Sequence, residues 1–126
     1  MYVYGAPYVD KPRGLDGVKM AAEIKRKCTV NIPTKDFDVP ELEVYTKGIE
    51  QALELLVKKG EIFFGCMGGI GRTGLGIAGL LKLYDKTYLG GTKSATLYRD
   101  VIRKEIHPHA VETQQQLEYI DTYLTN

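Results

Sequence analysis

The sequence predicts a single α/β domain over residues 1–126, built on a short, mostly parallel central sheet flanked by helices. Short runs rich in β-branched and aromatic residues alternate with longer stretches whose apolar residues recur at helical spacing. In the middle of the chain, a short apolar run at 62–64 enters a glycine-rich turn at 65–74, which opens into a long apolar stretch at 75–84. With 126 residues and a hydrophobic fraction of 44%, the chain is long enough for one core.

The overall composition excludes several classes of protein. Lys and Arg number 17 against 16 Asp and Glu, so the formal net charge of +1 gives no global field for nucleic acid or an anionic membrane. Two cysteines are too few for a disulfide framework, and the first residues do not have the pattern of a secretion signal. No apolar stretch approaches the roughly 20 residues of a membrane helix. We therefore expect a cytoplasmic protein with no membrane partner and no strong nucleic-acid preference.

The first third of the chain is expected to begin with a strand at 2–4, followed by a loop rich in Gly, Pro and charge at 10–17. A helix is predicted over about 15–27, because four apolar residues recur there at roughly helical spacing: Val18, Ala21, Ala22 and Ile24. We expect this helix to be followed by a strand.

The next segment is expected to continue with a β-branched strand at 28–32, which places Cys28 in the core, and a polar loop at 34–39. Pro40 marks the start of a helix that Gly60 closes. The apolar stripe of that helix consists of Tyr45, Ile49, Leu53 and Leu56.

The stretch 75–84 is apolar on nearly every side, which is typical of a helix buried in the middle of a domain. Each glycine in a helix costs roughly 1 kcal/mol relative to alanine, so glycines there suggest close packing of the backbone against a neighbour. The glycines concerned are Gly74, Gly76 and Gly79.

The last part of the chain is expected to form two further helices after a turn at 90–91. Ser94 can cap the first of them, the segment 107–109 breaks it, and the second runs from about Val111.

The turn at 65–74 is the main candidate for a functional site. A glycine-rich turn between a strand and a helix directs backbone N–H groups toward one point, and the helix N-terminus adds partial positive charge. Two nucleotide patterns fit poorly: the P-loop G-x-x-x-x-G-K-S/T would need glycine at Cys66 and lysine at Arg72. Residues 69–74 fit the dinucleotide pattern G-x-G-x-x-G, but no second strand ending in an acidic residue follows at the required distance.

A third pattern uses every special residue of the turn: Cys66, five residues, Arg72 and Thr73. Held by N–H groups at a helix N-terminus, the Cys66 thiolate is a nucleophile. The planar guanidinium of Arg72 can hold two phosphoryl oxygens, and the Thr73 hydroxyl can donate to the sulfur when a phosphocysteine breaks down.

Residues 66–74 resemble the signature loop C-x-x-G-x-x-R-S/T-G of the cysteine-dependent protein tyrosine and dual-specificity phosphatases. The resemblance implies a dual-specificity-phosphatase-like fold with an abbreviated N-terminus. It also implies phosphomonoester hydrolysis through a phosphocysteine, without metal or cofactor, on a phosphorylated substrate, with a phosphoprotein favoured. By the same resemblance, the loop residues bind the substrate phosphate together with Arg72: Met67, Gly68, Gly69, Ile70 and Gly71.

The resemblance also assigns residues outside the loop. A general acid is implied at Asp36, which stands 30 positions before Cys66, with Asp38 as the rival that more simply caps the following helix. Gln116, on the last helix, is the residue implied to position water. The family usually has histidine immediately before the cysteine, where this chain has Gly65. A phosphate-binding module with impaired catalysis, or a phosphatase of a non-protein substrate such as an RNA 5′ end, therefore stays open.

Overall fold

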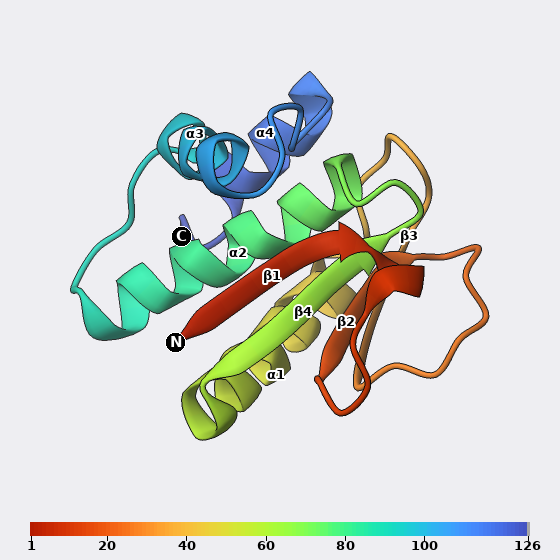
Figure 1. The fold of residues 1–126 in the computed structure, drawn as a ribbon. Helices are drawn as coiled ribbons and strands as arrows, with labels where there is room; N and C mark the ends of the chain where they lie inside the picture. Colours follow the sequence, from red (N-terminus) through yellow and green to blue (C-terminus); the bar gives the residue numbers. More distant parts are fainter. Residues whose placement is uncertain (126) are drawn as a thin grey trace.

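A computed structural model describes residues 1–125 as a four-stranded, fully parallel sheet with the strand order β1-β4-β2-β3. The predicted fold class, α/β with a parallel central sheet flanked by helices, is confirmed (Figure 1). The elements are β1 (Tyr2–Pro7), a 3-10 helix (Tyr8–Asp10), β2 (Gly17–Ala21), β3 (Val30–Thr34), α1 (Leu42–Lys59), β4 (Glu61–Cys66), α2 (Gly71–Tyr88), α3 (Ala95–Glu105) and α4 (Gln114–Thr122).

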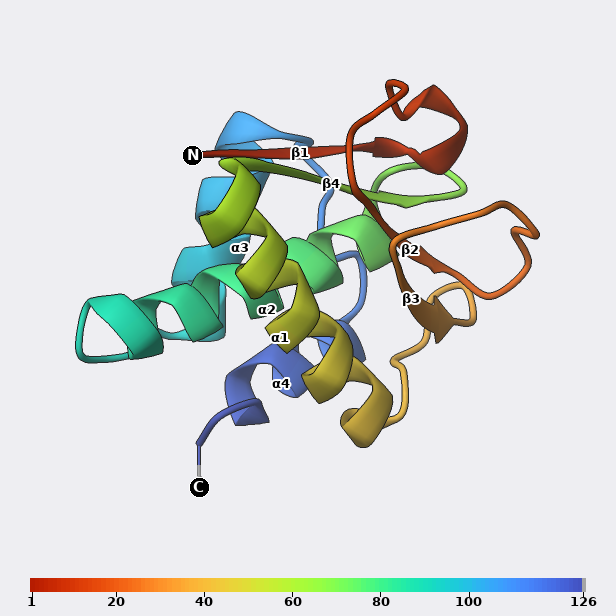
Figure 2. The same ribbon diagram turned by 90° about the horizontal axis from the view of Figure 1, so that it is seen from below.

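The helices are all on one side of the sheet. Figures 1 and 2 show α1 and α2 packed against one face, with α3 and α4 beyond α2. The 3-10 helix and the loop that follows it lie on the opposite face. Because all strands run in one direction, their carboxyl ends meet at a single edge, which is the edge where α/β proteins bind their ligands.

The helix predicted over 15–27 is wrong. Residues 17–21 form β2, which pairs with β4 on one side and β3 on the other and is buried along its whole length. A strand buried on both faces shows no alternation, so periodicity could not separate it from a helix. Even Lys19 is buried in β2, with its ammonium group donating hydrogen bonds to the carbonyls of Ile24 and Arg26.

The strand predicted at 28–32 is shifted. β3 begins at Val30, so Cys28 lies before it and is half-buried rather than part of the core. The strand continues through Pro33 to Thr34, which an edge strand tolerates because one row of its N–H groups faces away from the ladder.

The other helices follow the predicted pattern with small shifts. The predicted apolar stripe of α1 is buried, and Gly60 ends the helix in the left-handed conformation with φ 82°. The Ser94 hydroxyl caps α3 by accepting from the Leu97 N–H. The last helix begins at Gln114 instead of Val111, because Thr113 caps it and Val111 has φ 59°.

α2 is the buried central helix that the apolar pattern predicts, and its glycines lie at close contacts. A Cβ on Gly74 would stand 2.8 Å from the Val111 nitrogen, and one on Gly76 would stand 2.7 Å from the Phe64 ring. A Cβ on Gly79 would overlap the hydroxyl of Tyr45, which donates to the Leu75 carbonyl at 2.8 Å. Within residues 1–125, no helix is long and apolar enough to span a membrane.

Gly79→Ala should destabilise the protein by about 1–3 kcal/mol, because the added methyl overpacks the contact with Tyr45 and disturbs its hydrogen bond. Urea unfolding followed by circular dichroism measures the change. Gly91→Ala is the matched control, since nothing lies within 4 Å of a Cβ there. Equal midpoints for the two variants would contradict the close approach of α1 and α2.

Candidate active site

The loop between β4 and α2 joins Cys66 to the N-terminus of a buried helix. β4 ends at Cys66, whose side chain is 3% exposed, and α2 begins at Gly71. Ile70 is the N-cap residue of α2 and offers no side-chain acceptor, so no side chain caps the first N–H groups of the helix. Gly69 has φ 72° and lies against the backbone of Ala6 and Pro7, a position that no other residue type could occupy without strain.

Thr73 lies next to the sulfur of Cys66. Its hydroxyl donates a hydrogen bond to Sγ at 3.1 Å, and both side chains are buried. The structure thus brings Thr73 and Cys66 into contact, and the role of Thr73 toward a leaving thiolate stays a prediction.

Arg72 is almost fully buried and is held from one side. Nη1 donates to Oε1 of Glu23 at 2.6 Å and to the Thr34 carbonyl at 2.9 Å, while Nη2 donates to Oε2 of Glu23 at 2.8 Å. Nε has no hydrogen-bond partner. Of the five N–H groups of the guanidinium, the one on Nε and the second on Nη2 are left, and they share one edge of the plane. This edge can bind two oxygens of one phosphate.

Glu23 is the site residue that sequence reasoning missed. It follows β2 at the carboxyl edge of the sheet, inside the segment for which a helix is predicted. Its bidentate hydrogen bond with Arg72, followed by a backbone N–H, lowers the pKa of Glu23 to about 2. Burial acts to lower the pKa of Arg72, but its hydrogen bond to Glu23 and the nearby Cys66 outweigh that effect and raise it. Had residues 17–21 been assigned to a strand, an acidic residue just after its carboxyl end would have marked Glu23 as a candidate site residue.

The loop after β3 brings Asp36, and not the carboxylate of Asp38, to Arg72. Oδ1 of Asp36 lies 3.6 Å from Nε of Arg72 and accepts from the Phe37 N–H, and 57% of the side chain is exposed. Oδ1 of Asp38 accepts from the N–H of Val39 at 2.8 Å. The interpretation of Asp38 as a helix cap is wrong, because the N-cap residue of α1 is Glu41.

Gln116 is buried and uses both ends of its amide. Its oxygen accepts from the N–H groups of Glu112 and Thr113, and its nitrogen donates to the Asp38 carbonyl at 3.3 Å. Gln116 thus contacts the loop that carries Asp36, through its hydrogen bond to the Asp38 carbonyl. Its contact with water in the site stays a prediction.

Gly65 occupies a space that cannot hold a side chain. A Cβ there would stand 2.6 Å from Cα of Tyr8 and 2.9 Å from the Phe63 ring. The 3-10 helix after β1 therefore packs directly on the strand that delivers Cys66. A histidine before the cysteine would displace this turn.

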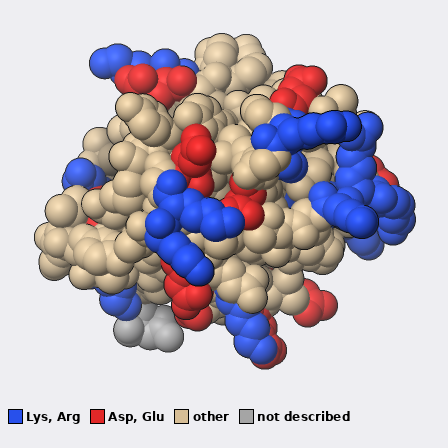
Figure 3. All heavy atoms as spheres, turned by 60° about the horizontal axis from the view of Figure 1, so that its bottom comes forward, with Lys and Arg blue, Asp and Glu red and all other residues tan. Residues whose placement is uncertain are grey.

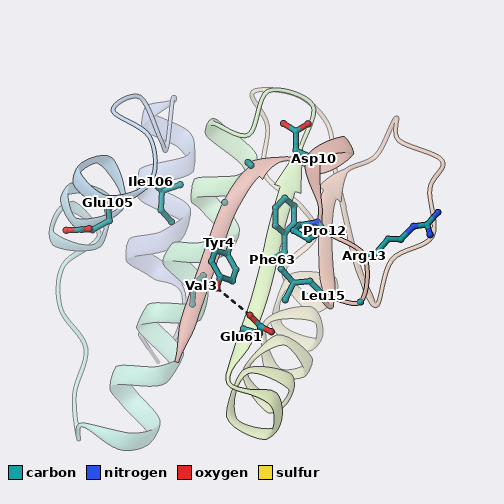
Figure 4. A pocket seen from close by; sticks show the side chains of 13 residues that line it. Val3, Tyr4, Asp10, Pro12, Arg13, Leu15, Glu61, Phe63, Glu105 and Ile106 are labelled. Atoms are coloured by element: carbon teal, nitrogen blue, oxygen red, sulfur yellow. Dashed lines mark hydrogen bonds between the residues drawn. The ribbon is translucent and has the colours of Figure 1, made fainter.

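A separate groove lies away from this site. It has a volume of about 720 Å³ and crosses β1 and the open face of β4, with Tyr4, Leu15 and Phe63 on its surface (Figure 4). Neither Cys66 nor Arg72 lines it, and its carboxylates make it unsuitable for a phosphate dianion: Asp10, Glu61 and Glu105. Within residues 1–125, no group of three or more His, Cys, Asp and Glu is arranged to hold a metal ion. The rings of His107 and His109 have their centroids 5.7 Å apart.

The fold matches solved structures of phosphatases. Tk-PTP in its active form shares 24% sequence identity over 84% of this chain and 76% of its own, with a TM-score of 0.66. Kinase associated phosphatase, with its catalytic-site cysteine replaced by serine, shares 18% over 93% and 79%, with a TM-score of 0.69. PTPMT1 shares 19% over 85% and 74%, with a TM-score of 0.62. No family model and no characterised protein sequence matches the chain.

The chain therefore has the fold of the cysteine-dependent protein tyrosine and dual-specificity phosphatases. This confirms the fold that the signature loop implies. At these identities the likeness establishes the architecture, and the chemistry has to be argued from the residues of the site.

Glu23→Gln should lower the free energy of unfolding near neutral pH, and the difference from wild type should shrink as the pH falls. The pKa of Glu23 is about 2 in the folded state against an ordinary value of 4.5, so its contribution is present above pH 4.5 and is lost toward pH 2. Because 45% of the side chain is exposed, screening limits the effect to about 1 kcal/mol.

Urea titrations at pH 6, 4 and 3 measure this difference. Glu54→Gln, an exposed change of the same kind on α1, is the control and should stay near wild type throughout. A Glu23→Gln deficit that is constant from pH 6 to pH 3 would contradict the ion pair with Arg72.

Proposed function

We propose that this protein is a phosphomonoester hydrolase that works through a phosphocysteine and needs no metal, most directly a protein tyrosine or dual-specificity phosphatase. The observation that carries the proposal is the free edge of Arg72. Glu23 occupies the other edge, so that Nε and one N–H of Nη2 remain available in the loop that holds Cys66. Nε makes no hydrogen bond within residues 1–125, although Oδ1 of Asp36 lies 3.6 Å away, and a phosphate fits two N–H groups on one edge.

In the first step, Cys66 Sγ attacks phosphorus, an S–P bond forms and the bond from phosphorus to the leaving oxygen breaks. Arg72 and the uncapped N–H groups at the start of α2 hold the non-bridging oxygens and stabilise their charge. Asp36 donates its proton to the leaving oxygen. Its partly exposed carboxyl, 3.6 Å from Nε of Arg72, supports this role.

In the second step, water attacks the phosphocysteine and the S–P bond breaks, releasing inorganic phosphate. Asp36, now ionised, takes the proton of the water. The Thr73 hydroxyl donates to the departing sulfur, to which it is already hydrogen-bonded at 3.1 Å. Gln116 supports this step through the Asp38 carbonyl, by fixing the loop that carries Asp36.

The structural neighbours support this chemistry. In kinase associated phosphatase, a cysteine is the catalytic-site residue, and PTPMT1 has been crystallised with PI(5)P. For this chain we favour a phosphorylated protein as substrate. A non-protein phosphoester such as an RNA 5′ end is the alternative.

A phosphate-binding module with impaired catalysis is the second candidate. Gly65 favours it, because Tyr8 fills the space in which the family's histidine would help to hold the loop. The retained set of Cys66, Arg72, Thr73 and Asp36 favours the enzyme.

Hydrolysis of 4-nitrophenyl phosphate in EDTA separates the two candidates. We expect activity in wild type, a loss of at least about a thousandfold in Cys66→Ser, and a loss of about a hundredfold in Asp36→Asn. Asp38→Asn is the matched control and should stay within about threefold of wild type, because its carboxylate bonds only to the backbone of the loop.

Activity that survives Cys66→Ser would refute the phosphocysteine. If Asp38→Asn loses activity and Asp36→Asn keeps it in full, the general acid is Asp38 and not Asp36. If all variants are inactive but inorganic phosphate binds wild type in calorimetry, the binding module is the better description.

A further inference from the structure

A second cationic site lies beside the candidate active site. A pocket of about 370 Å³, here called the basic pocket, is lined by four cations together with Tyr8 and Val9: Lys11, Arg13, Arg26 and Lys27. Its walls are the loop after the 3-10 helix and the loop between β2 and β3. Figure 3 shows Lys and Arg side chains gathered at the end of the molecule where these loops lie.

The local excess of positive charge is not neutralised. Residues 1–35 contain seven of the 17 Lys and Arg but only three of the 16 Asp and Glu, in a chain whose net charge is +1. Two of those three acids are engaged elsewhere, since Asp16 pairs with Lys59 at 2.8 Å and Glu23 with Arg72. Within residues 1–125, no carboxylate lies within 4.0 Å of the charged groups of Arg13, Arg26 or Lys27.

The members of the basic pocket have different roles. The Lys11 ammonium donates to the carbonyls of Pro12 and Leu15, so it shapes the loop. Arg13, Arg26 and Lys27 are exposed. Arg13 lines both this pocket and the groove over β1, and Figure 4 shows its side chain extending toward the side of the sheet where the β2–β3 loop lies. Arg13, Arg26 and Lys27 thus line one pocket.

Two contacts link the basic pocket to the catalytic loop. The backbone of Tyr8 packs on Gly65, and its hydroxyl donates to the Lys27 carbonyl at 3.0 Å. The same hydroxyl lies against Gly17, which is in register with Phe63, three residues before Cys66. With a rise of about 3.3 Å per residue, Phe63 lies roughly 10 Å along β4 from Cys66, so the Tyr8 hydroxyl that lines the pocket is about that far or farther from the nucleophile.

We propose that the basic pocket binds a second phosphate of the substrate, so that the preferred substrates carry two phosphate groups roughly 10 Å apart. The inference rests on the proposed function for the first phosphate, which Arg72 binds. The exposed loop residues Met67 and Gly68 are uncharged, so they cannot recognise a second anion at the mouth of the site. The cations of the basic pocket are groups that can.

Hexane-1,6-diol bisphosphate and the corresponding monophosphate test this, because the extended diol spans such a distance and the two compounds differ only in the second phosphate. We expect wild type to show a KM about tenfold lower for the bisphosphate. The double variant Arg26→Gln/Lys27→Gln should lose this preference and keep its rate on 4-nitrophenyl phosphate within about twofold. Lys86→Gln/Lys104→Gln removes the same charge from exposed positions on α2 and α3 and should keep the preference.

Calorimetry on Cys66→Ser separates this inference from the proposed function, because it needs no turnover. Tighter binding of the bisphosphate by Cys66→Ser, abolished by adding Arg26→Gln and Lys27→Gln, would support the basic pocket even if wild type is inactive. Equal affinity for the two compounds, or a preference that survives in the Arg26→Gln/Lys27→Gln background, would overturn it.

Discussion

The ion pair between Glu23 and Arg72 is the interaction on which the candidate site depends. A guanidinium buried to this degree is costly unless it is paired and its N–H groups are satisfied. Glu23 supplies both from the end of β2, and the Thr34 carbonyl adds a bond from the end of β3. The pair thus joins two strand ends to the start of α2. It also decides which edge of Arg72 stays free for a ligand.

The geometry of the glycine loop could be predicted from sequence because its residues are close together in the chain. A thiol, a guanidinium and a hydroxyl at fixed spacing between a strand and a helix lie together whatever the rest of the fold, as the contact of Thr73 with Cys66 shows. The amphipathic α1 and the buried α2 were predictable for the same reason, since their periodicity is contained in one segment.

The parts that could not be predicted depend on pairing between distant segments. β2 is a strand because β4 and β3 flank it, and its own residues fit a helix almost as well. Glu23 is 49 positions from Arg72, and its role appears only when β2 ends beside α2. The same holds for Gly65, whose missing side chain looks like a defect in the sequence but is required by the approach of Tyr8 in space.

The hydrogen bond from Gln116 to the Asp38 carbonyl joins segments that are 78 positions apart. It attaches the loop of the candidate general acid to α4, a helix of nine residues. A helix this short opens at a lower free-energy cost than the core sheet does. In hydrogen exchange, the amides of α4 and of the loop at 35–39 should therefore open as one unit. The temperature at which catalysis fails would then be set by the melting of α4, below the temperature at which the sheet unfolds.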